Sequence, residues 1–129
     1  MKIKSRKNIV KRLDTVFSLY IRLKDSEDEM VKCFTCNKIS HYKKNMQCGH
    51  FQSRKSYSTR WDVTNCAVQC YGCNVMQQGR QYEFALNLIQ KYGKQIVDDL
   101  IIKSKQIVKY SNDDLESMII YYNNLLNKL

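Results

Sequence analysis

The sequence contains no proline and only four glycines, and it has no long apolar run. Without proline, no proline-rich linker marks a domain boundary, so we expect one domain covering residues 1–129. No stretch approaches the roughly 20 apolar residues that a membrane-spanning helix needs. The basic start is also not followed by the apolar segment of a secretory signal. We therefore expect a cytoplasmic protein without a membrane partner.

Acidic residues are scarce as well, because 12 Asp and Glu oppose 22 Lys and Arg, which gives a formal net charge of +10. The first twelve residues hold six basic side chains and no acidic one, and a second basic run covers residues 43–60. The acidic residues gather at 25–29 and in the C-terminal third. This polarised excess of positive charge indicates a polyanionic partner, and nucleic acid is the first candidate.

Several segments have the apolar period of an amphipathic helix. Residues 5–24 form the first, with a basic outer face, and the acidic cluster at 25–29 ends it. The period returns at 81–92, where Gly93 is placed to cap the helix, and another segment follows at 94–108. The regular parts of the chain are therefore predicted to be mainly helical.

The last helix is predicted from residues that resemble a capping box, Ser111 and Asp114. An apolar stripe follows at helical spacing and indicates either core packing against the first helix or the surface of a homodimer. The stripe consists of Leu115, Met118, Ile119, Tyr122, Leu125, Leu126 and Leu129.

Six cysteines in a chain expected to be cytoplasmic indicate metal ligands sooner than disulfides. Four of them form two CxxC pairs, Cys33 with Cys36 and Cys70 with Cys73, and four thiolates complete a tetrahedral Zn²⁺ shell. Such a shell is closed, so this Zn²⁺ should be structural. Cys48 and Cys66 remain, either as buried thiols or as ligands of a metal close to the only nearby histidine.

Residues 30–75 are rich in Cys, Gly, Asn, Gln and Ser, which is typical of hairpins and loops arranged around a metal. The sequence therefore predicts an α+β domain with three parts. These are a basic N-terminal helix (1–29), a zinc-braced core (30–92) and C-terminal helices (93–129).

Ordered motifs between residues 32 and 100 resemble those of the phage NinG/Rap recombination proteins. The motifs are CGHF at 48–51, TRWD at 59–62, NC at 65–66, QCYGCN at 69–74 and FALNLIQKYG at 84–93. This resemblance implies a small zinc-stapled ββα-metal (HNH-like) core and a structure-specific endonuclease acting on branched DNA such as Holliday junctions. It also implies the cytoplasm of a bacterial host as the location, if the chain is encoded by a phage.

The resemblance assigns roles residue by residue. His50 matches the first HNH histidine, the general base, and Asn65 matches the middle asparagine that orients this histidine through the loop. Asn74 matches the final metal-binding position, where its amide oxygen would help to hold Mg²⁺ or Mn²⁺. A metal held by His50 and Asn74 together is the alternative, and it would remove His50 from the role of base.

Basic and aromatic residues surround these positions. Arg54, Lys55 and Arg60 are expected to contact DNA phosphates, with Arg suited to bidentate contact. Trp61, the only tryptophan, either stacks on an exposed base or is buried beneath the loop.

The chain departs from most HNH sites at Gly49, where those sites place a metal-binding aspartate. Asp62 and Gln47 are candidates for the missing ligand. His41, the only other histidine, is expected to be a solvated loop residue or a phosphate contact.

The predicted function is metal-dependent endonucleolytic cleavage of branched DNA, by a homodimer if both cuts of a junction are to be made. The alternative is a zinc-stapled DNA-binding accessory protein of recombination without catalysis. A zinc-bridged protein-interaction domain would leave the clustered arginines unexplained.

Overall fold

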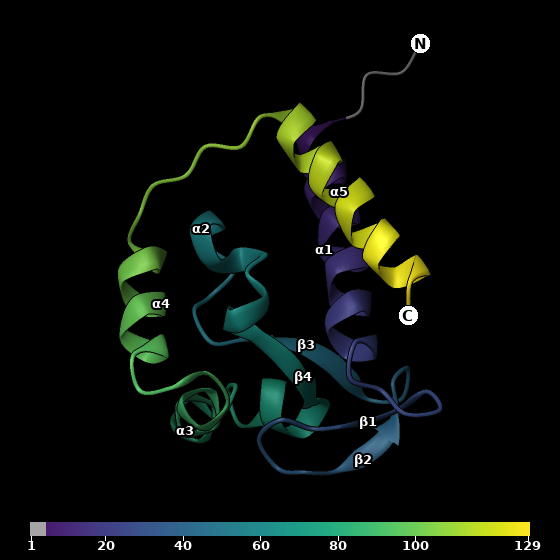
Figure 1. Cartoon of the computed structure of the whole chain (residues 1–129), viewed down its shortest axis with the longest axis vertical. Coiled ribbons are helices and arrows are strands. Elements are labelled where there is room, and N and C mark those ends of the chain that lie inside the picture. The colour runs from purple at the N-terminus through teal and green to yellow at the C-terminus, as the bar shows by residue number, and fades with distance from the viewer. Residues whose placement is uncertain (1–4) are drawn as a thin grey trace.

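A computed structural model describes residues 5–129 as an α+β fold in which helices surround two small sheets (Figure 1). Lys2 and Lys4 of the basic N-terminal segment lie outside the described residues. In chain order the elements are α1 (Arg6–Leu23), β1 (Met30–Lys32), β2 (Ile39–His41), β3 (Met46–His50), α2 (Tyr57–Arg60), the 3-10 helix η1 (Val63–Asn65), β4 (Cys66–Cys70), the π-helix η2 (Gly72–Met76), α3 (Gln81–Tyr92), α4 (Ile96–Ser104) and α5 (Asn112–Asn127).

Two antiparallel pairs of strands make up the sheets, β1 with β2 and β3 with β4. In the second pair Met46 lies opposite Cys70 and His50 lies opposite Cys66. Figure 1 shows this pair in the middle of the molecule, with α1 and α5 on one side and α3 and α4 on the other. A loop that contains α2 and η1 connects β3 to β4, and it returns the chain to the end of β3.

The helix α1 follows the predicted period closely. Ser5 caps it by accepting a hydrogen bond from the Asn8 backbone N–H over 3.2 Å. Five of its apolar residues recur at helical spacing and are buried, which places one face of the helix in the core. These residues are Ile9, Leu13, Val16, Phe17 and Ile21.

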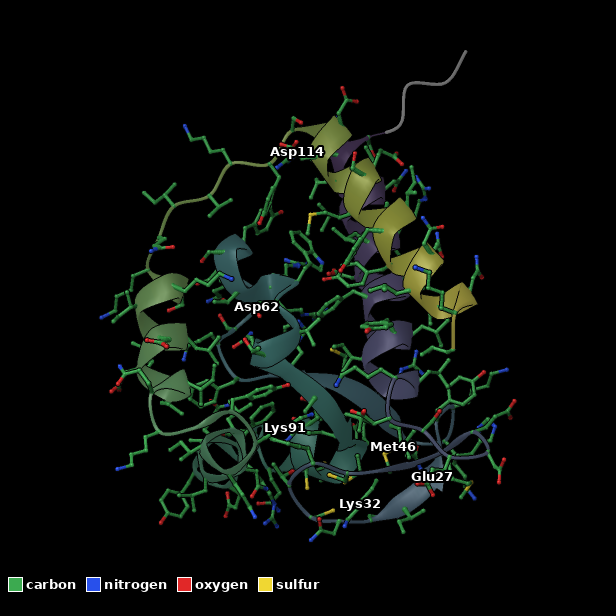
Figure 2. The ribbon with its side chains drawn as sticks, in the orientation of Figure 1. Glu27, Lys32, Met46, Asp62, Lys91 and Asp114 are labelled. Carbon is green, nitrogen blue, oxygen red and sulfur yellow. The ribbon has the colours of Figure 1, made fainter. Side chains whose placement is uncertain are left out.

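The helix α5 begins at the predicted capping box, in which the Ser111 side chain and the Asp114 side chain each bind the other residue's backbone. Figure 2 shows Asp114 at the start of this helix. Leu115, Ile119 and Tyr122 are buried against α1, so the prediction of core packing for the apolar stripe is confirmed. The last residue of the stripe, Leu129, does not follow this prediction, because it is 62 % exposed.

The helices α3 and α4 cover the other side of the central strands. Phe84 and Leu88 of α3 pack with Leu100 of α4 in a separate apolar cluster. Gly93 has φ 102° and donates its N–H to the Ile89 carbonyl, which confirms it as the C-terminal cap. The predicted helical segment 94–108 was too long, because α4 ends at Ser104 in a tight turn. No helix within residues 5–129 is both long and apolar enough to cross a membrane.

Candidate active site

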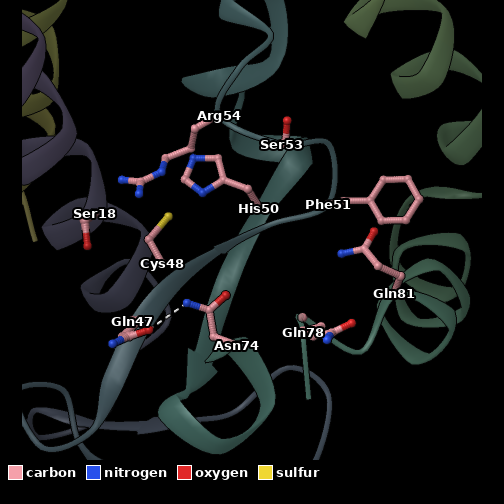
Figure 3. A pocket seen from close by; sticks show the side chains of 11 residues that line it. Ser18, Gln47, Cys48, His50, Phe51, Ser53, Arg54, Asn74, Gln78 and Gln81 are labelled. Atoms are coloured by element: carbon pink, nitrogen blue, oxygen red, sulfur yellow. Dashed lines mark hydrogen bonds between the residues drawn. The ribbon is translucent and has the colours of Figure 1, made fainter. Parts of the chain in front are cut away.

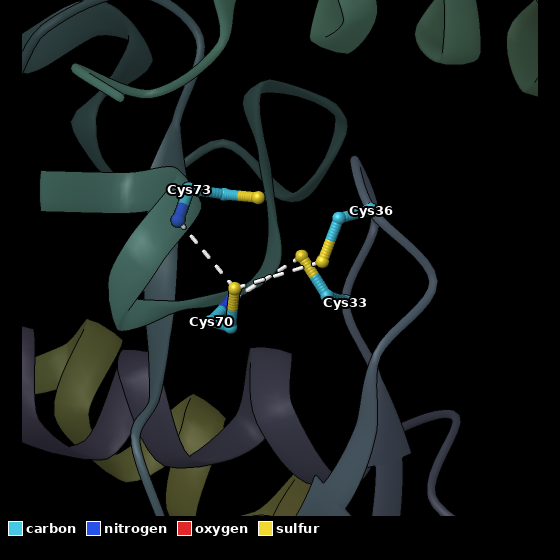
Figure 4. Close-up of side chains that lie close together, drawn as sticks. All are labelled: Cys33, Cys36, Cys70 and Cys73. Atoms are coloured by element: carbon cyan, nitrogen blue, oxygen red, sulfur yellow. Dashed lines mark hydrogen bonds between the residues drawn. The ribbon is translucent and has the colours of Figure 1, made fainter. Parts of the chain in front are cut away.

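The four cysteines of the two CxxC pairs converge on one point (Figure 4). Cys33 follows β1, Cys36 lies in the turn after it, Cys70 ends β4 and Cys73 belongs to η2. Their four sulfur atoms lie within 4.8 Å of one another, and the Cys36 and Cys70 sulfurs are 3.7 Å apart. The cluster predicted from the spacing is therefore confirmed, and it is consistent with a structural Zn²⁺.

The protonation chemistry of this cluster also fits a cation. Burial would raise the pKa of Cys33, but hydrogen bonds from the Cys70 backbone N–H (3.3 Å) and from Thr35 lower it to about 6. Burial and neighbouring sulfurs raise the pKa of Cys73 to about 12. A Zn²⁺ ion held by the cluster would supply the positive charge that lets neighbouring thiols ionise.

Next to the cysteine cluster lies a polar cavity of about 660 Å³ (Figure 3). Asn74 directly follows Cys73, so the four-cysteine cluster fixes its position. Its Nδ2 donates a hydrogen bond to Gln47 Oε1 over 2.6 Å. The cavity is lined by Ser18, Gln47, Cys48, His50, Phe51, Ser53, Arg54, Asn74, Gln78, Gly79 and Gln81. The structure thus brings His50 and Asn74 together at one cavity.

His50 is the last residue of β3, and its ring is fixed by the loop that follows. The ring Nε2 lies 2.9 Å from the Arg60 backbone oxygen. Because a carbonyl only accepts, Nε2 must carry the proton and Nδ1 must carry the free lone pair. Burial lowers the pKa of His50, the hydrogen bond to Arg60 partly offsets this, and the Arg54 charge lowers it further. The ring is therefore neutral near pH 7.

Asn65 holds the loop that carries the Arg60 carbonyl. Its side chain is fully buried and makes three hydrogen bonds to this loop. Oδ1 accepts from the Gln52 backbone N–H (2.8 Å), and Nδ2 donates to the carbonyls of Gln52 and Thr59 (3.0 Å each). Since Thr59 precedes Arg60, this geometry suits the orienting role that the resemblance implies for Asn65.

A network centred on Asp14 of α1 supports the same loop, and the sequence did not predict it. Asp14 Oδ1 accepts from Arg60 Nε (3.1 Å) and from Trp61 Nε1 (2.9 Å). The signal was present in the sequence, because Asp14 is the only acidic residue of a basic helix and lies next to the apolar position Leu13.

The residues expected to contact DNA are spread over different places. Arg54 lines the cavity, whereas Lys55 lines a separate hollow beside α4. Arg60 turns its guanidinium to Asp14, so it is not free to clamp a phosphate. Trp61 is only 5 % exposed, so burial beneath the loop, and not base stacking, describes its place.

Position 49, where the resemblance to HNH sites would place an aspartate, cannot readily hold a side chain larger than that of glycine. A Cβ at residue 49 would lie 2.0 Å from Gln69 Oε1. Gln69 is fully buried, and its Nε2 is held by Thr35 (3.0 Å) and by the Gly79 carbonyl (2.9 Å). A carboxylate at this position would therefore have to displace a fixed side chain.

The two candidates for the missing ligand differ in their surroundings. Asp62 is engaged elsewhere, with Thr64 at its Oδ1 and Lys103 Nζ 2.6 Å from its Oδ2. Gln47 lines the cavity, and by the two-residue period of a strand it shares a face with Gly49. No described residue that lines the cavity carries a carboxylate. Apart from the Cys48 thiol, which prefers softer ions, the ligand atoms that it offers are amide and hydroxyl oxygens and an imidazole. These suit Mg²⁺ or Mn²⁺ only together with oxygen ligands from water and phosphate.

The remaining histidine and cysteines also have defined places. His41, on β2, lies 2.9 Å from a Glu29 oxygen and does not line the cavity. Cys48 lines the cavity and Cys66 is buried behind it. The sulfurs of Cys48 and Cys66 and a ring nitrogen of His50 lie within 4.8 Å of one another.

Comparison with known protein families gives a match over the whole chain. The profile of the family described as "Bacteriophage Lambda NinG protein" matches residues 1–129. Neither the curated proteins nor the solved structures contain a match to the chain.

Proposed function

The chain belongs to the bacteriophage lambda NinG protein family, and on this premise we propose that it is a metal-dependent endonuclease that cleaves branched DNA. The observation that carries the proposal is the state of His50, a neutral imidazole with its tautomer fixed at the edge of a polar, basic cavity. A histidine in this state is suited to act as a general base near neutral pH. In this proposal the strands β3 and β4 and the following helical segment form an HNH-like core.

His50 would take a proton on Nδ1 from a water molecule that attacks the scissile phosphate. The new bond joins the water oxygen to phosphorus, the bond from phosphorus to the leaving sugar oxygen breaks, and that oxygen takes a proton from solvent water. The Arg60 carbonyl stabilises the imidazolium that forms, because it accepts from Nε2–H. Asn65 keeps this carbonyl in place through the loop.

Gln47 and Asn74 are the residues that would hold Mg²⁺ or Mn²⁺, together with phosphate oxygens of the DNA. The bound cation would offset the negative charge that grows on the phosphate. Figure 3 shows the Asn74 side-chain oxygen on the side away from Gln47, where it can bind the metal ion. Arg54, on the opposite rim of the cavity, can bind the same phosphate through its guanidinium.

The DNA-binding surface would extend from this cavity along α1. A shallow groove shares Ser18 and Arg54 with the cavity and is also lined by Lys11, Arg22 and Asp14, whose carboxylate is paired with Arg60. This continuous basic surface suits contacts to phosphates, which give affinity without sequence selectivity. Selectivity for branched DNA would then depend on the shape of the junction.

A zinc-stapled DNA-binding accessory protein of recombination is the second candidate function. It is favoured by one observation, the absence of a carboxylate among the described residues that line the cavity. The same basic groove would serve either function. The two proposals therefore differ in whether His50 performs chemistry.

The test is cleavage of end-labelled four-way junction, fork and linear duplex DNA with Mg²⁺, Mn²⁺ or EDTA. The native protein is compared with His50→Ala and with His41→Ala. The second variant is the matched control, because His41 is the other histidine and does not line the cavity. Cleavage that requires the metal and His50, but not His41, supports the nuclease. Junction binding without any cleavage by the native protein supports the accessory role instead.

Resolution of a four-way junction requires two cuts, and we propose that two copies of the chain act together on one junction. Both cuts would then come from equivalent sites related by symmetry. Sedimentation of the protein with and without junction DNA measures this directly. A complex that contains a single chain per junction would contradict it.

A further inference from the structure

We propose that Cys48, His50 and Cys66 form a second metal site, for a thiophilic divalent cation such as Zn²⁺, and that its occupation switches off the cavity described above. The metal site stands on geometry alone. The switch rests on the proposed function, because it works by taking the base away from the reaction. Neither the cysteine cluster nor the candidate Mg²⁺ site includes the two thiols.

The paired strands β3 and β4 bring the three side chains together. His50 lies directly opposite Cys66, and Cys48 precedes His50 by two residues, so all three project from one face of the sheet. Their potential ligand atoms lie within 4.8 Å of one another. Figure 3 shows the imidazole ring beside the Cys48 sulfur. A modest rotation of the side chains would therefore place all three around one ion.

The hydrogen bond of His50 suits a metal ligand. Histidines that bind metals almost always donate their other ring N–H to a carbonyl or carboxylate, which fixes the tautomer. Here Nε2–H donates to the Arg60 carbonyl over 2.9 Å, and Nδ1 keeps the lone pair. The Cys66 sulfur also lies 3.9 Å from the same carbonyl oxygen. The supporting contact of a metal site is thus already formed.

The donor set selects the class of cation. Two thiolates and one imidazole prefer Zn²⁺ and similar soft ions, whereas Mg²⁺ requires oxygen donors. Two thiolates also balance the charge of a divalent cation. Three protein ligands leave one coordination position open, and the cavity reaches Cys48 and His50 but not the buried Cys66. The open position would therefore face the cavity, where water or a phosphate can occupy it.

The consequence for the reaction concerns the lone pair of His50. A nitrogen that binds Zn²⁺ cannot accept a proton from water, so His50 cannot serve both purposes. The four-cysteine cluster has one more ligand, two more thiolates and a closed shell, so it should fill first. The protein would then cleave DNA with one Zn²⁺ per chain, in the four-cysteine cluster, and would be inhibited once a second Zn²⁺ binds at His50.

The metal site is tested by counting Zn²⁺ per chain with native mass spectrometry of the full chain, loaded with rising Zn²⁺ under reducing conditions. We expect two ions in the native protein and one in Cys48→Ser and Cys66→Ser. Ser53→Ala, which changes the same cavity without removing a thiol, should retain two. A single ion in the native protein, or two ions in Cys48→Ser, would overturn the site. Cys48→Ser decides the matter if the buried Cys66→Ser fails to fold.

The switch is tested by dividing the cleavage rate with added Zn²⁺ by the rate without it, separately for each protein. The Zn²⁺ concentration that halves this ratio should rise at least about 10-fold in Cys48→Ser, because loss of even an outer-shell partner of a metal costs about 10–100-fold in affinity and Cys48 is itself a ligand. Equal inhibition of both proteins would overturn the switch, because Zn²⁺ would then act elsewhere. If the native protein cleaves no DNA, the nuclease proposal fails, whereas the count of bound Zn²⁺ still decides the metal site.

Discussion

The side-chain amide of Asn74 donates a hydrogen bond to the side-chain oxygen of Gln47 across 2.6 Å. Because Asn74 directly follows Cys73, this contact joins the four-cysteine cluster to the strand β3 that carries His50. The position of Asn74 in the cavity is therefore fixed by the cluster on one side and by β3 on the other. Gln47 also lies on the same face of β3 as Gly49, the position at which most HNH sites have a metal-binding aspartate.

Gln47→Glu should strengthen binding of the Mg²⁺ or Mn²⁺ ion that the proposed nuclease requires. Glutamate keeps the length of the side chain and can still accept from Asn74, but it adds a negative charge to a cavity that has none. A charge-assisted contact contributes about 1.5–3 kcal/mol, and 1.4 kcal/mol is tenfold in affinity. We expect the Mn²⁺ concentration for half-maximal cleavage to fall about tenfold, measured by titrating Mn²⁺ against cleavage of a four-way junction.

Gln47→Leu provides the matched control, since it has a similar volume without an oxygen donor. It should raise the Mn²⁺ requirement and leave junction binding in EDTA little changed. If both variants need the same Mn²⁺ concentration as the native protein, Gln47 does not face the cation.

Removal of the structural Zn²⁺ should unfold the middle of the chain. Cys33→Ser removes a sulfur whose pKa is lowered to about 6 and leaves three thiols that cannot complete the shell. We expect loss of Zn²⁺ and a non-cooperative thermal transition, as in other small domains that fold with their metal. Circular dichroism during heating measures this, and Cys48→Ser, outside the cluster, should keep a cooperative transition.

The sequence predicted those features of the fold that depend on neighbours in the chain. The period of α1, the Ser111–Asp114 capping box and the Gly93 cap each follow from residues within one or two turns. The zinc cluster was also predictable, because the CxxC spacing itself brings two sulfurs together. Resemblance to a family supplied His50, Asn65 and Asn74, which spacing alone does not single out.

The features that the sequence did not predict depend on contacts between distant segments. Asp14 meets Arg60 only after α1 packs on the central strands. The clash that excludes an aspartate at Gly49 comes from Gln69 on the paired strand, and its severity depends on the register. The length of α4 was overestimated for a related reason, since Ile107 continues the apolar pattern yet is 90 % exposed.

Asn65→Ala should destabilise the loop strongly. It would leave the Gln52 N–H and the Gln52 and Thr59 carbonyls without their buried partner, at about 1–3 kcal/mol for each unsatisfied group. We expect a loss of about 2–4 kcal/mol in the free energy of unfolding, since water can reach part of the loop. Urea denaturation measures it. A loss below that of the exposed Asn8→Ala would show that the loop is held by other contacts.

The pH dependence of cleavage should report the buried state of His50. Burial first, and then the Arg54 charge, lower its pKa below the ordinary value of 6.5. Because the base acts when neutral, kcat/KM should fall on the acidic side at a pH below 6.5. Between the lowered pKa and 6.5 the unfolded chain binds more protons than the folded chain, so stability also falls as the pH decreases through this window.

Arg54→Gln tests the electrostatic part of this shift. Removing the positive charge should move the acidic limb of the pH profile upward, toward 6.5, while burial keeps it below that value. Lys55→Gln removes a neighbouring charge outside the cavity and should leave the limb unchanged. An acidic limb above 6.5 in the native protein would mean that the group that titrates is not the buried imidazole of His50.

Asp14→Asn should disturb the position of His50 without touching it. Asparagine has nearly the same shape, but its amide can turn only one acceptor toward the three N–H donors of Arg60 and Trp61. One buried donor then faces an NH₂ group, which should cost roughly 1–3 kcal/mol of unfolding free energy. The Arg60 carbonyl that fixes the His50 ring would shift with its loop, so kcat should decrease while KM for junction DNA changes little.

Glu116→Gln is the control for this prediction, because it weakens the more exposed Arg12–Glu116 ion pair between α1 and α5. Exposed pairs contribute about 0–1 kcal/mol, so stability and kcat should stay close to native values. Single-turnover cleavage and urea denaturation of both variants separate the two effects. If Asp14→Asn lowers stability and leaves kcat at the native value, the network stabilises α1 against the loop but does not position the base. If it lowers kcat in a urea-free assay in which the protein is fully folded, Asp14 acts on His50 through the Arg60 carbonyl.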